Sequence, residues 1–156
     1  MNETTLERVK EVLLSSLGDD LQKAEALGVF GSLARGIDFS ANSDIDIFVV
    51  LQHKDPHGAT DKWWWKRIKR ALEPFQRDVT VLVYTVGGLK AVCNWYVLRL
   101  AAEGVLLYDQ GAIAHLFERI VDAARQANLV QDSIDSLTVW TVKPGHASGP
   151  LDVSLA

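Results

Sequence analysis

The stretch Val29–Leu51 reads VFGSLARGIDFSANSDIDIFVVL and decides the fold of the chain. Near its start, Gly31-Ser32 ends an apolar run, and a short segment compatible with a helix follows as far as Gly36. Near its end, Ser43-Asp44-Ile45-Asp46 leads directly into the apolar residues Ile47–Leu51. The pattern predicts a strand, a glycine turn into a short helix, and a second buried strand that begins with an acidic pair.

The glycine turn has the properties of a phosphate-binding site. A strand that turns at a glycine into a helix N-terminus exposes free backbone N–H groups and the positive end of the helix dipole. Gly31 allows a ligand to approach the backbone closely, and the Ser32 hydroxyl adds a further hydrogen-bonding group. A Gly-Ser pair alone is most often an ordinary turn, so this half of the pattern is weak evidence by itself.

The acidic pair has the properties of a metal site. Side chains alternate between the two faces of a strand, so Asp44 and Asp46 point the same way, roughly 6.6 Å apart along the chain, while Ile45 points into a core. Two neighbouring carboxylates at the mouth of a buried strand repel each other, and a hard cation such as Mg²⁺ removes that repulsion. Together, a phosphate turn and an acidic pair with an apolar strand on each side predict nucleotide chemistry.

Both halves of this pattern also resemble a known family. Gly31-Ser32-x-x-Arg35-Gly36 followed by Ser43-Asp44-x-Asp46 is similar to the signature of the polymerase-β-type nucleotidyltransferase superfamily, especially its minimal nucleotidyltransferase (MNT) branch. The resemblance covers about residues 24–108, and it departs from the commonest form in the spacer Ile37–Asn42, which is one residue longer. It implies an α+β fold of the polymerase-β-like type, in which a mixed sheet is flanked by helices.

Length and composition agree with a single ordinary domain of 156 residues and 17.2 kDa. The chain is 48% hydrophobic and 23% charged, and no apolar run approaches the ~20 residues that a membrane helix needs. The single cysteine, Cys93, excludes an internal disulfide and is expected to be a small core residue. With a polar N-terminus, this composition predicts a cytoplasmic protein without a signal peptide. A net charge of −4 argues against bulk nucleic-acid binding.

Periodicity predicts helices and strands along the whole chain. Helices are expected at Leu6–Leu17, opened by a capping box Thr4-x-x-Glu7, at Thr60–Pro74, from Val86-Gly87-Gly88 to Gly104, and at Gly111–Ala127. Strands are expected at Ala24–Phe30, 44–51, Arg77–Tyr84 and Val105–Tyr108. Beyond residue 127, proline and glycine are expected to prevent regular structure except for a strand at Leu137–Val142. We therefore divide the chain into a nucleotidyltransferase domain, 1–127, and a C-terminal arm, 128–156, that is irregular or ordered by a partner.

Three consecutive tryptophans, Trp63, Trp64 and Trp65, lie in the helix Thr60–Pro74. Successive residues of a helix are about 100° apart, so the three side chains cannot share one buried face. Trp65 is expected on the buried face, and Trp63 on the outer side with basic residues. Two interpretations remain for Trp63: it packs on a neighbouring element while Trp64 and Trp65 lie in the core, or it is an exposed aromatic residue on a basic partner surface.

Asp78 opens the strand Arg77–Tyr84. The alternation places Val79, Val81 and Val83 on one face of that strand and Asp78, Thr80 and Leu82 on the other. From the residues alone, an acid at this point caps the strand or is solvated. The resemblance implies instead that Asp78 supplies the third carboxylate of an acidic triad.

The resemblance also implies what the site binds: a nucleoside triphosphate, with ATP favoured, and two Mg²⁺ ions. The residues implied as catalytic and metal-binding are Asp44, Asp46 and Asp78. Asp78 would act as the base, or as an electrostatic anchor, for the hydroxyl group that attacks the α-phosphorus. Nucleotide contacts are implied at Gly31, Ser32, Arg35, Gly36 and Ser43. Arg35 neutralises a phosphate or forms an ion pair with Asp38 or Asp44, whereas Ser43 caps the turn and orients Asp44.

The resemblance implies that AMP is transferred to a hydroxyl group. Small MNT proteins look like antitoxins paired with a helical HEPN toxin, and such a partner is the expected acceptor. A small-molecule acceptor, such as an aminoglycoside-like antibiotic, is an alternative, but residues 109–156 are too short to form its pocket without a homodimer. A third alternative is a non-catalytic module that binds a partner. The presence of Ser32 and all three acids favours an active site over that alternative.

Overall fold

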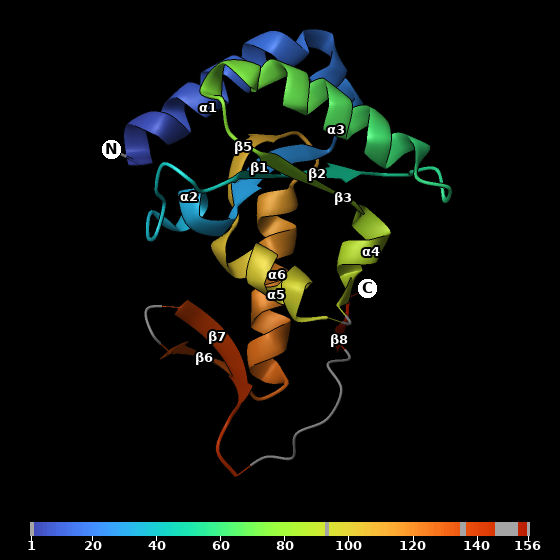
Figure 1. Ribbon diagram of the computed structural model, residues 1–156. Coiled ribbons are helices and arrows are strands. Elements are labelled where there is room, and N and C mark those ends of the chain that lie inside the picture. The colour runs from blue at the N-terminus through green and yellow to red at the C-terminus, as the bar shows by residue number, and fades with distance from the viewer. Residues whose placement is uncertain (1, 93, 135–136, 146–152, 156) are drawn as a thin grey trace.

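The computed structural model describes residues 2–92, 94–134, 137–145 and 153–155, and its centre is a four-stranded mixed sheet (Figure 1). The strand order is β3-β2-β1-β5. Strand β1 (Ala26–Phe30) is antiparallel to both neighbours, β2 (Ile45–Leu51) and β5 (Val105–Asp109), whereas β2 and β3 (Val79–Thr85) run parallel. The predicted α+β class with a mixed sheet is confirmed.

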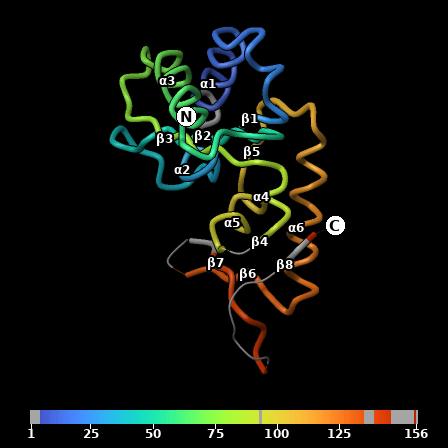
Figure 2. Tube along the Cα trace, turned by 90° about the vertical axis from the view of Figure 1, so that its right-hand side faces the viewer, coloured from blue at the N-terminus to red at the C-terminus, as the bar shows by residue number. Residues whose placement is uncertain are grey.

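Helices cover both faces of the sheet, as the two perpendicular views show (Figures 1 and 2). One face carries α1 (Asn2–Leu17) and α3 (Ala59–Ala71), and the other carries α5 (Trp95–Glu103) and α6 (Ile113–Gln126). Each face has its own apolar core. Strand β2 contributes to both cores, which explains its nearly continuous apolar sequence. In the described part of the chain, no helix is both long and apolar enough to cross a membrane.

The C-terminal part of the chain is more regular than the sequence predicts. The expected strand is confirmed as β7 (Leu137–Val142), but it pairs with an unexpected antiparallel partner, β6 (Leu129–Ile134). Asn128, with φ +66°, ends the preceding helix, and buried Leu129 anchors the new strand in the second core. The prediction that residues 129–134 are irregular is therefore wrong. The division of the chain at residue 127 stays a prediction.

The first helix is longer than expected. It begins at Asn2, so Thr4 lies inside the helix and the predicted capping box is wrong. The polar residues before Leu6 include no helix breaker, and the helix therefore continues back past the expected cap. Its end at Leu17 is as predicted, because Gly18 takes a left-handed conformation with φ +51°. A 3₁₀ helix, η1 (Gly18–Lys23), then leads to β1.

The predicted long helix that ends at Gly104 is wrong, because this segment is divided. A short α4 (Val86–Lys90) is capped by the Thr85 hydroxyl, which accepts from the Gly88 N–H at 3.0 Å. Strand β4 (Ala91–Val92) then pairs with β8 (Val153–Ser154), and α5 starts afresh. Asn94 caps α5, since its side-chain oxygen accepts from the Val97 N–H at 3.0 Å. Tyr96, in the first turn of α5, is 75% exposed. Cys93 lies outside the described residues.

Helix α3 turns only Trp64 into the core, and not Trp65, which was also expected there. Trp64 is 2% exposed and continues the buried row to Ile68 and Ala71, whereas Trp65 is 38% exposed and lies under the Lys69 ammonium at 4.6 Å. Trp63 is 39% exposed and packs edge-on against Trp64. Placing Trp65 in the core was therefore wrong by one residue of helix phase, which corresponds to about 100°. A second 3₁₀ helix, η2 (Glu73–Phe75), follows α3.

This difference gives a stability prediction. We expect Trp64→Ala to lower the free energy of unfolding by about 3–5 kcal/mol, because it leaves a large cavity in the first core. Trp65→Ala, the matched control, is expected to cost less than about 1 kcal/mol, the scale of an exposed cation–π contact. Urea denaturation followed by circular dichroism measures both values. If the two variants lost the same free energy of unfolding, the conclusion that Trp64 is buried and Trp65 is not would be contradicted.

Candidate active site

The acidic pair lies at the start of β2, as the sequence predicts. Ile45 and Ile47 are fully buried in the first core, so Asp46 between them faces the opposite side of the sheet. Asp46 is half-buried and lies opposite Phe30 of the neighbouring strand β1. Asp44 precedes the strand and is exposed. The Asp46 carboxylate is thus partly enclosed by the protein, whereas the Asp44 carboxylate lies in solvent at the edge of the site.

Gly31 brings the predicted phosphate turn against Asp46. It follows β1 directly, has φ +72°, and begins the short helix α2 (Gly31–Arg35). A Cβ atom at this position would overlap the Asp46 carboxylate oxygen Oδ2, so the backbone and the acid are in close approach. Helix α2 ends at Gly36, whose N–H donates to the Ser32 carbonyl at 3.0 Å. The acid and the Gly-Ser turn, fifteen positions apart in the sequence, therefore form one site.

Burial raises the pKa of Asp46, and three neighbours modify this effect. A hydrogen bond with the Thr80 side chain and the positive charge of Arg35 lower the pKa, whereas the negative charge of Asp44 raises it further. Thr80 lies beside Asp46 because β2 and β3 pair in parallel register. Because the ionised form of Asp46 is unfavourable here, a bound cation would lower its free energy.

Arg35 pairs with an acid that the sequence did not indicate. Its guanidinium Nη1 lies 3.8 Å from Oε2 of Glu103 at the end of α5, and Arg99 Nε lies 3.5 Å from the same oxygen. The prediction that Arg35 forms an ion pair with Asp38 or Asp44 is therefore wrong. Arg35 Nε and Glu103 Oε1 are buried and have no hydrogen-bond partner among the described residues. This cluster retains polar atoms that a ligand could satisfy.

A small, mainly apolar pocket opens beside the Gly31 turn. It has a volume of about 190 Å³ and extends from the ion cluster to the side chains of β3 and α5. Its apolar lining comes from Phe30, Leu82, Tyr84, Tyr96 and Leu100. Burial raises the pKa of the Tyr84 hydroxyl, so this group stays neutral at physiological pH. An apolar pocket with two arginines at one end suits a flat ring joined to an anionic group.

Residues 7–95, more than half of the chain, match the family model described as nucleotidyltransferase domain. The chain belongs to this nucleotidyltransferase family. Among solved structures it resembles a toxin–antitoxin with AMP-PNP, with a TM-score of 0.52 and 19% identity over 76% of this chain and 89% of that one. It also resembles a mutant of the toxin–antitoxin MntA–HpeT, with a TM-score of 0.51 and 16% identity over 76% and 88%. These likenesses show the fold. No curated protein sequence matches the chain.

The donors in this nucleotidyltransferase domain fit a magnesium ion that is completed by a substrate. No group of three or more Asp, Glu, His or Cys side chains in the described residues is arranged to hold a metal by itself. Mg²⁺ is usually bound through one or two carboxylates, with water and phosphate oxygens completing an octahedron. Asp44 and Asp46 supply two carboxylates. Burial disfavours the ionised form of Asp46, and a bound cation would offset this cost.

Asp78 lies beside Asp44 rather than beside Asp46. Its carbonyl accepts from the Ile45 N–H at 2.9 Å, and the register continues with Val79 opposite Ile45. Both Asp44 and Asp78 border an open groove on the α3 side of the site. The residue next to Asp46 is Thr80, which we did not single out, although the alternation along β3 puts it on the same face. The role of Asp78 as the third carboxylate stays a prediction.

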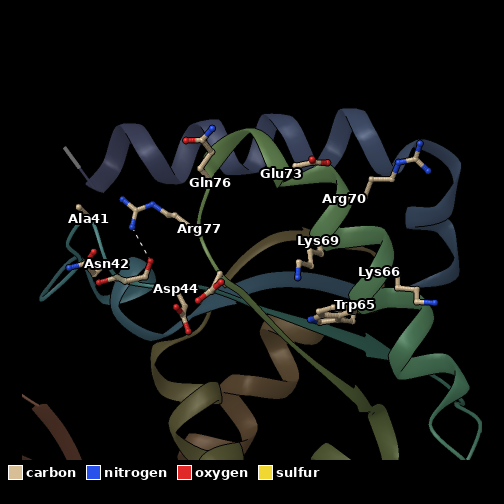
Figure 3. Close-up of a pocket in the computed structure, with 12 residues that line it drawn as sticks. Ala41, Asn42, Asp44, Trp65, Lys66, Lys69, Arg70, Glu73, Gln76 and Arg77 are labelled. Carbon is tan, nitrogen blue, oxygen red and sulfur yellow. Dashed lines mark hydrogen bonds between the residues drawn. The ribbon is translucent and has the colours of Figure 1, made fainter.

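The loop that carries Asp44 is held by Arg77, which sequence reasoning also missed. The Arg77 side chain points toward the segment that carries Asp44 (Figure 3). Its Nη1 donates to the Ser40 carbonyl at 2.6 Å and to the Ser43 carbonyl at 2.9 Å, and its guanidinium stacks 4.4 Å from the Phe39 ring centre. The Ser43 hydroxyl accepts from the Ser40 N–H at 2.9 Å, so Ser43 caps this turn as expected. Arg77 and Ser43 together fix the segment directly before the acid.

We expect Arg77→Ala to reduce nucleotidyl transfer about 10- to 100-fold, since it frees the segment that positions Asp44. The effect should appear in kcat, and the melting temperature should change little because the loop is exposed. Steady-state kinetics and thermal unfolding measure the two quantities. Arg125→Ala is the control, because Arg125 is an exposed arginine in the last turn of α6 and lines neither this groove nor the apolar pocket. An equal loss of kcat in both variants would contradict a positioning role.

The groove beside Asp44 is large, with a volume of about 810 Å³. One wall is the segment 41–44, and the other is the C-terminal half of α3 with the residues that follow it (Figure 3). We call it the basic groove because four basic side chains line it together with Trp65: Lys66, Lys69, Arg70 and Arg77. It shares no lining residue with the apolar pocket at Gly31. Asp44 lines the basic groove, whereas Gly31, which closely approaches Asp46, lines the apolar pocket.

Proposed function

We propose that this domain transfers AMP from ATP to a hydroxyl group on a partner toxin protein, with Mg²⁺ bound at the acidic pair. The observation that carries the proposal is the close approach of the Asp46 carboxylate to the Gly31 backbone, with Asp44 at the rim. This arrangement brings metal ligands and a phosphate turn together. Membership of the nucleotidyltransferase family and the likeness to a toxin–antitoxin with AMP-PNP support it.

The triphosphate is assigned to the turn and to the cations behind it. The backbone N–H groups of Gly31–Leu33 and the Ser32 hydroxyl would donate to the β- and γ-phosphates. Arg35 and Arg99 lie at this end of the apolar pocket and would balance further negative charge. When bound to Asp44 and Asp46, Mg²⁺ would supply charge neutralisation at the phosphate oxygens.

The nucleoside is assigned to the apolar pocket beside the turn. Leu82 is 38% exposed and lies on the same face of the sheet as Asp46. Tyr84 and Tyr96 line the pocket together with Leu82. A purine ring placed there would bury apolar surface and contact two aromatic side chains. The preference for adenine rests on the AMP-PNP-containing neighbour and on the resemblance seen in the sequence.

The transfer is a single in-line displacement at the α-phosphorus. The acceptor oxygen forms a bond to that phosphorus, the bond from the α-phosphorus to the oxygen that bridges to the β-phosphorus breaks, and pyrophosphate leaves. Asp78 would take the proton of the acceptor hydroxyl, since it lies beside Asp44 on the open side of the site. A protein acceptor is proposed because both solved neighbours are described as toxin–antitoxin assemblies.

The test is transfer of radiolabel from α-³²P-ATP with Mg²⁺, using lysate of the source organism as acceptor. Wild type is compared with Asp44→Ala/Asp46→Ala, and with γ-labelled ATP as the control for kinase activity. We expect a labelled protein band from the α label alone, absent in the double variant. Asp19→Asn, an exposed acid far from the site, should leave the band unchanged. Label on a small molecule would favour an antibiotic-type acceptor, and ATP binding without any label would favour a binding module.

A further inference from the structure

The basic groove is placed where an acceptor must enter. Asp44 and Asp78 line it together with the C-terminal half of α3. The nucleotide is assigned to the other cavity, on the Gly31 side of the acidic pair. An acceptor hydroxyl that meets the α-phosphorus opposite the leaving pyrophosphate would therefore come from the groove side.

The groove concentrates positive charge on a chain whose net charge is −4. Lys66 and Arg70 are exposed, one helical turn apart, and neither forms an ion pair within the described residues. In contrast, Arg67 on the neighbouring face of α3 is paired with Asp20 at 3.1 Å. Arg67 is thus held by an ion pair within the fold, whereas Lys66 and Arg70 are free to contact a ligand.

The spacing of these cations suits an extended polypeptide. Lys66 and Arg70 are separated by about 6 Å along the helix axis, close to the ~7 Å between alternate side chains of an extended strand. The Lys69 ammonium lies 4.6 Å over one face of the Trp65 ring, so less of this aromatic surface is available to stack on bases. Glu73 and the two aspartates in the same groove would repel a phosphate backbone, which carries a charge on every residue, more than a peptide whose acidic residues alternate and lie only opposite Lys66 and Arg70.

We propose that the basic groove docks an acidic segment of the acceptor protein, with acidic residues on alternate positions beside the hydroxyl-bearing residue. This rests on the proposed function for the nature of the acceptor, but the docking itself is a property of the groove. Lys66 and Arg70 contact the acidic side chains, and the hydroxyl reaches Asp78. The groove thereby selects the acceptor by charge, before any bond is made.

Docking is tested by fluorescence anisotropy at low salt and without ATP. The probes are a short fluorescein-labelled peptide with a central tyrosine flanked by glutamates at alternate positions, the same peptide with lysines instead, and a labelled single-stranded oligouridylate. We expect the acidic peptide to bind the wild type more tightly than either of the other probes. Lys66→Glu/Arg70→Glu should weaken this binding about tenfold or more, because two attractive contacts become repulsive.

Lys10→Glu/Lys143→Glu is the matched control, with the same change of charge at exposed positions outside the groove. It should change the affinity less than twofold, and circular dichroism should show both variants folded. Equal weakening by the control, or equal binding of the lysine peptide, would overturn the proposal. Tighter binding of oligouridylate through Lys66 and Arg70 would also overturn it in favour of RNA. Addition of α-³²P-ATP and Mg²⁺ then tests transfer separately: a bound but unlabelled peptide would contradict the proposed function and leave the docking site standing.

Discussion

Asp46→Asn is expected to lower nucleotidyl transfer at least about 10³-fold, the loss that follows when several kcal/mol of metal-mediated stabilisation are removed. The asparagine keeps the shape of the side chain and one oxygen for Thr80, but it loses the charge that would hold Mg²⁺. Initial rates with α-³²P-ATP measure the change. Asp19→Asn, at an exposed position remote from the site, should keep the wild-type rate.

The same variant should not be less stable than the wild type when metal is absent. Burial raises the pKa of Asp46, so the folded state holds a proton more tightly than the unfolded state does. Asp46 therefore lowers stability as the pH rises from about 4 through its folded pKa, and this cost persists at neutral pH. The asparagine has no such cost, so the variant should gain stability relative to wild type between pH 4 and pH 7.

Thermal unfolding in EDTA across that range checks the sign. A melting temperature of Asp46→Asn clearly below the wild-type value at pH 7 would show that the carboxylate is a net stabilising group, contrary to the effect of burial. A variant that keeps its transfer rate would remove Asp46 from the metal site, whatever its stability. Addition of Mg²⁺ should raise the melting temperature of the wild type, and should do so much less in the variant.

The contact between the Gly31 turn and Asp46 could be predicted because the sequence patterns that encode it are local. Gly31 directly follows β1, and Asp46 lies in the adjacent antiparallel strand β2, which α2 and a loop join to β1, so a motif within one stretch of sequence encodes a contact in space. The left-handed turn requires glycine, and the strand alternation fixes the direction of Asp46. Patterns of this kind depend only on residues near each other along the chain.

The parts that sequence reasoning missed depend on contacts between distant segments. Thr80 faces Asp46 only because β2 and β3 pair in one particular register, which no single strand specifies. The partner of Arg35 is Glu103, at the end of a helix that follows three further strands. Arg77 holds carbonyls more than thirty positions earlier. In each case the residue type is visible in the sequence, but its partner is set by the tertiary fold.

Helix phase and helix ends were missed for a different reason. Trp64 and Trp65 are both apolar, so the amphipathic pattern of α3 fits the core in two phases that differ by one residue, and packing against the sheet selects one of them. The division between α4 and α5 depends on the pairing of β4 with β8, sixty positions later. Local propensity cannot anticipate such a pairing.

Gly31→Ala is expected to lower transfer about 100-fold or more and to destabilise the fold by at least ~1–2 kcal/mol. The alanine would be held in a left-handed conformation, which costs about that amount by itself. Its Cβ would also overlap Asp46 Oδ2, so the carboxylate or the turn must move. A displacement of about 1 Å in an active site can cost 100-fold in rate. Chemical denaturation and steady-state kinetics measure the two effects.

Gly36→Ala separates the two causes. Gly36 has nearly the same conformation, with φ +69°, but a Cβ there would meet open space. Its alanine variant should therefore carry the backbone strain without displacing Asp46, and should lose a similar ~1–2 kcal/mol. It should retain most of its activity, because a nucleotide contact predicted at Gly36 is made by the backbone, which alanine keeps. If both variants lose transfer equally, the turn acts through its backbone conformation rather than through its contact with Asp46. If only Gly31→Ala does, the close approach of the phosphate turn to the acid is what the reaction requires.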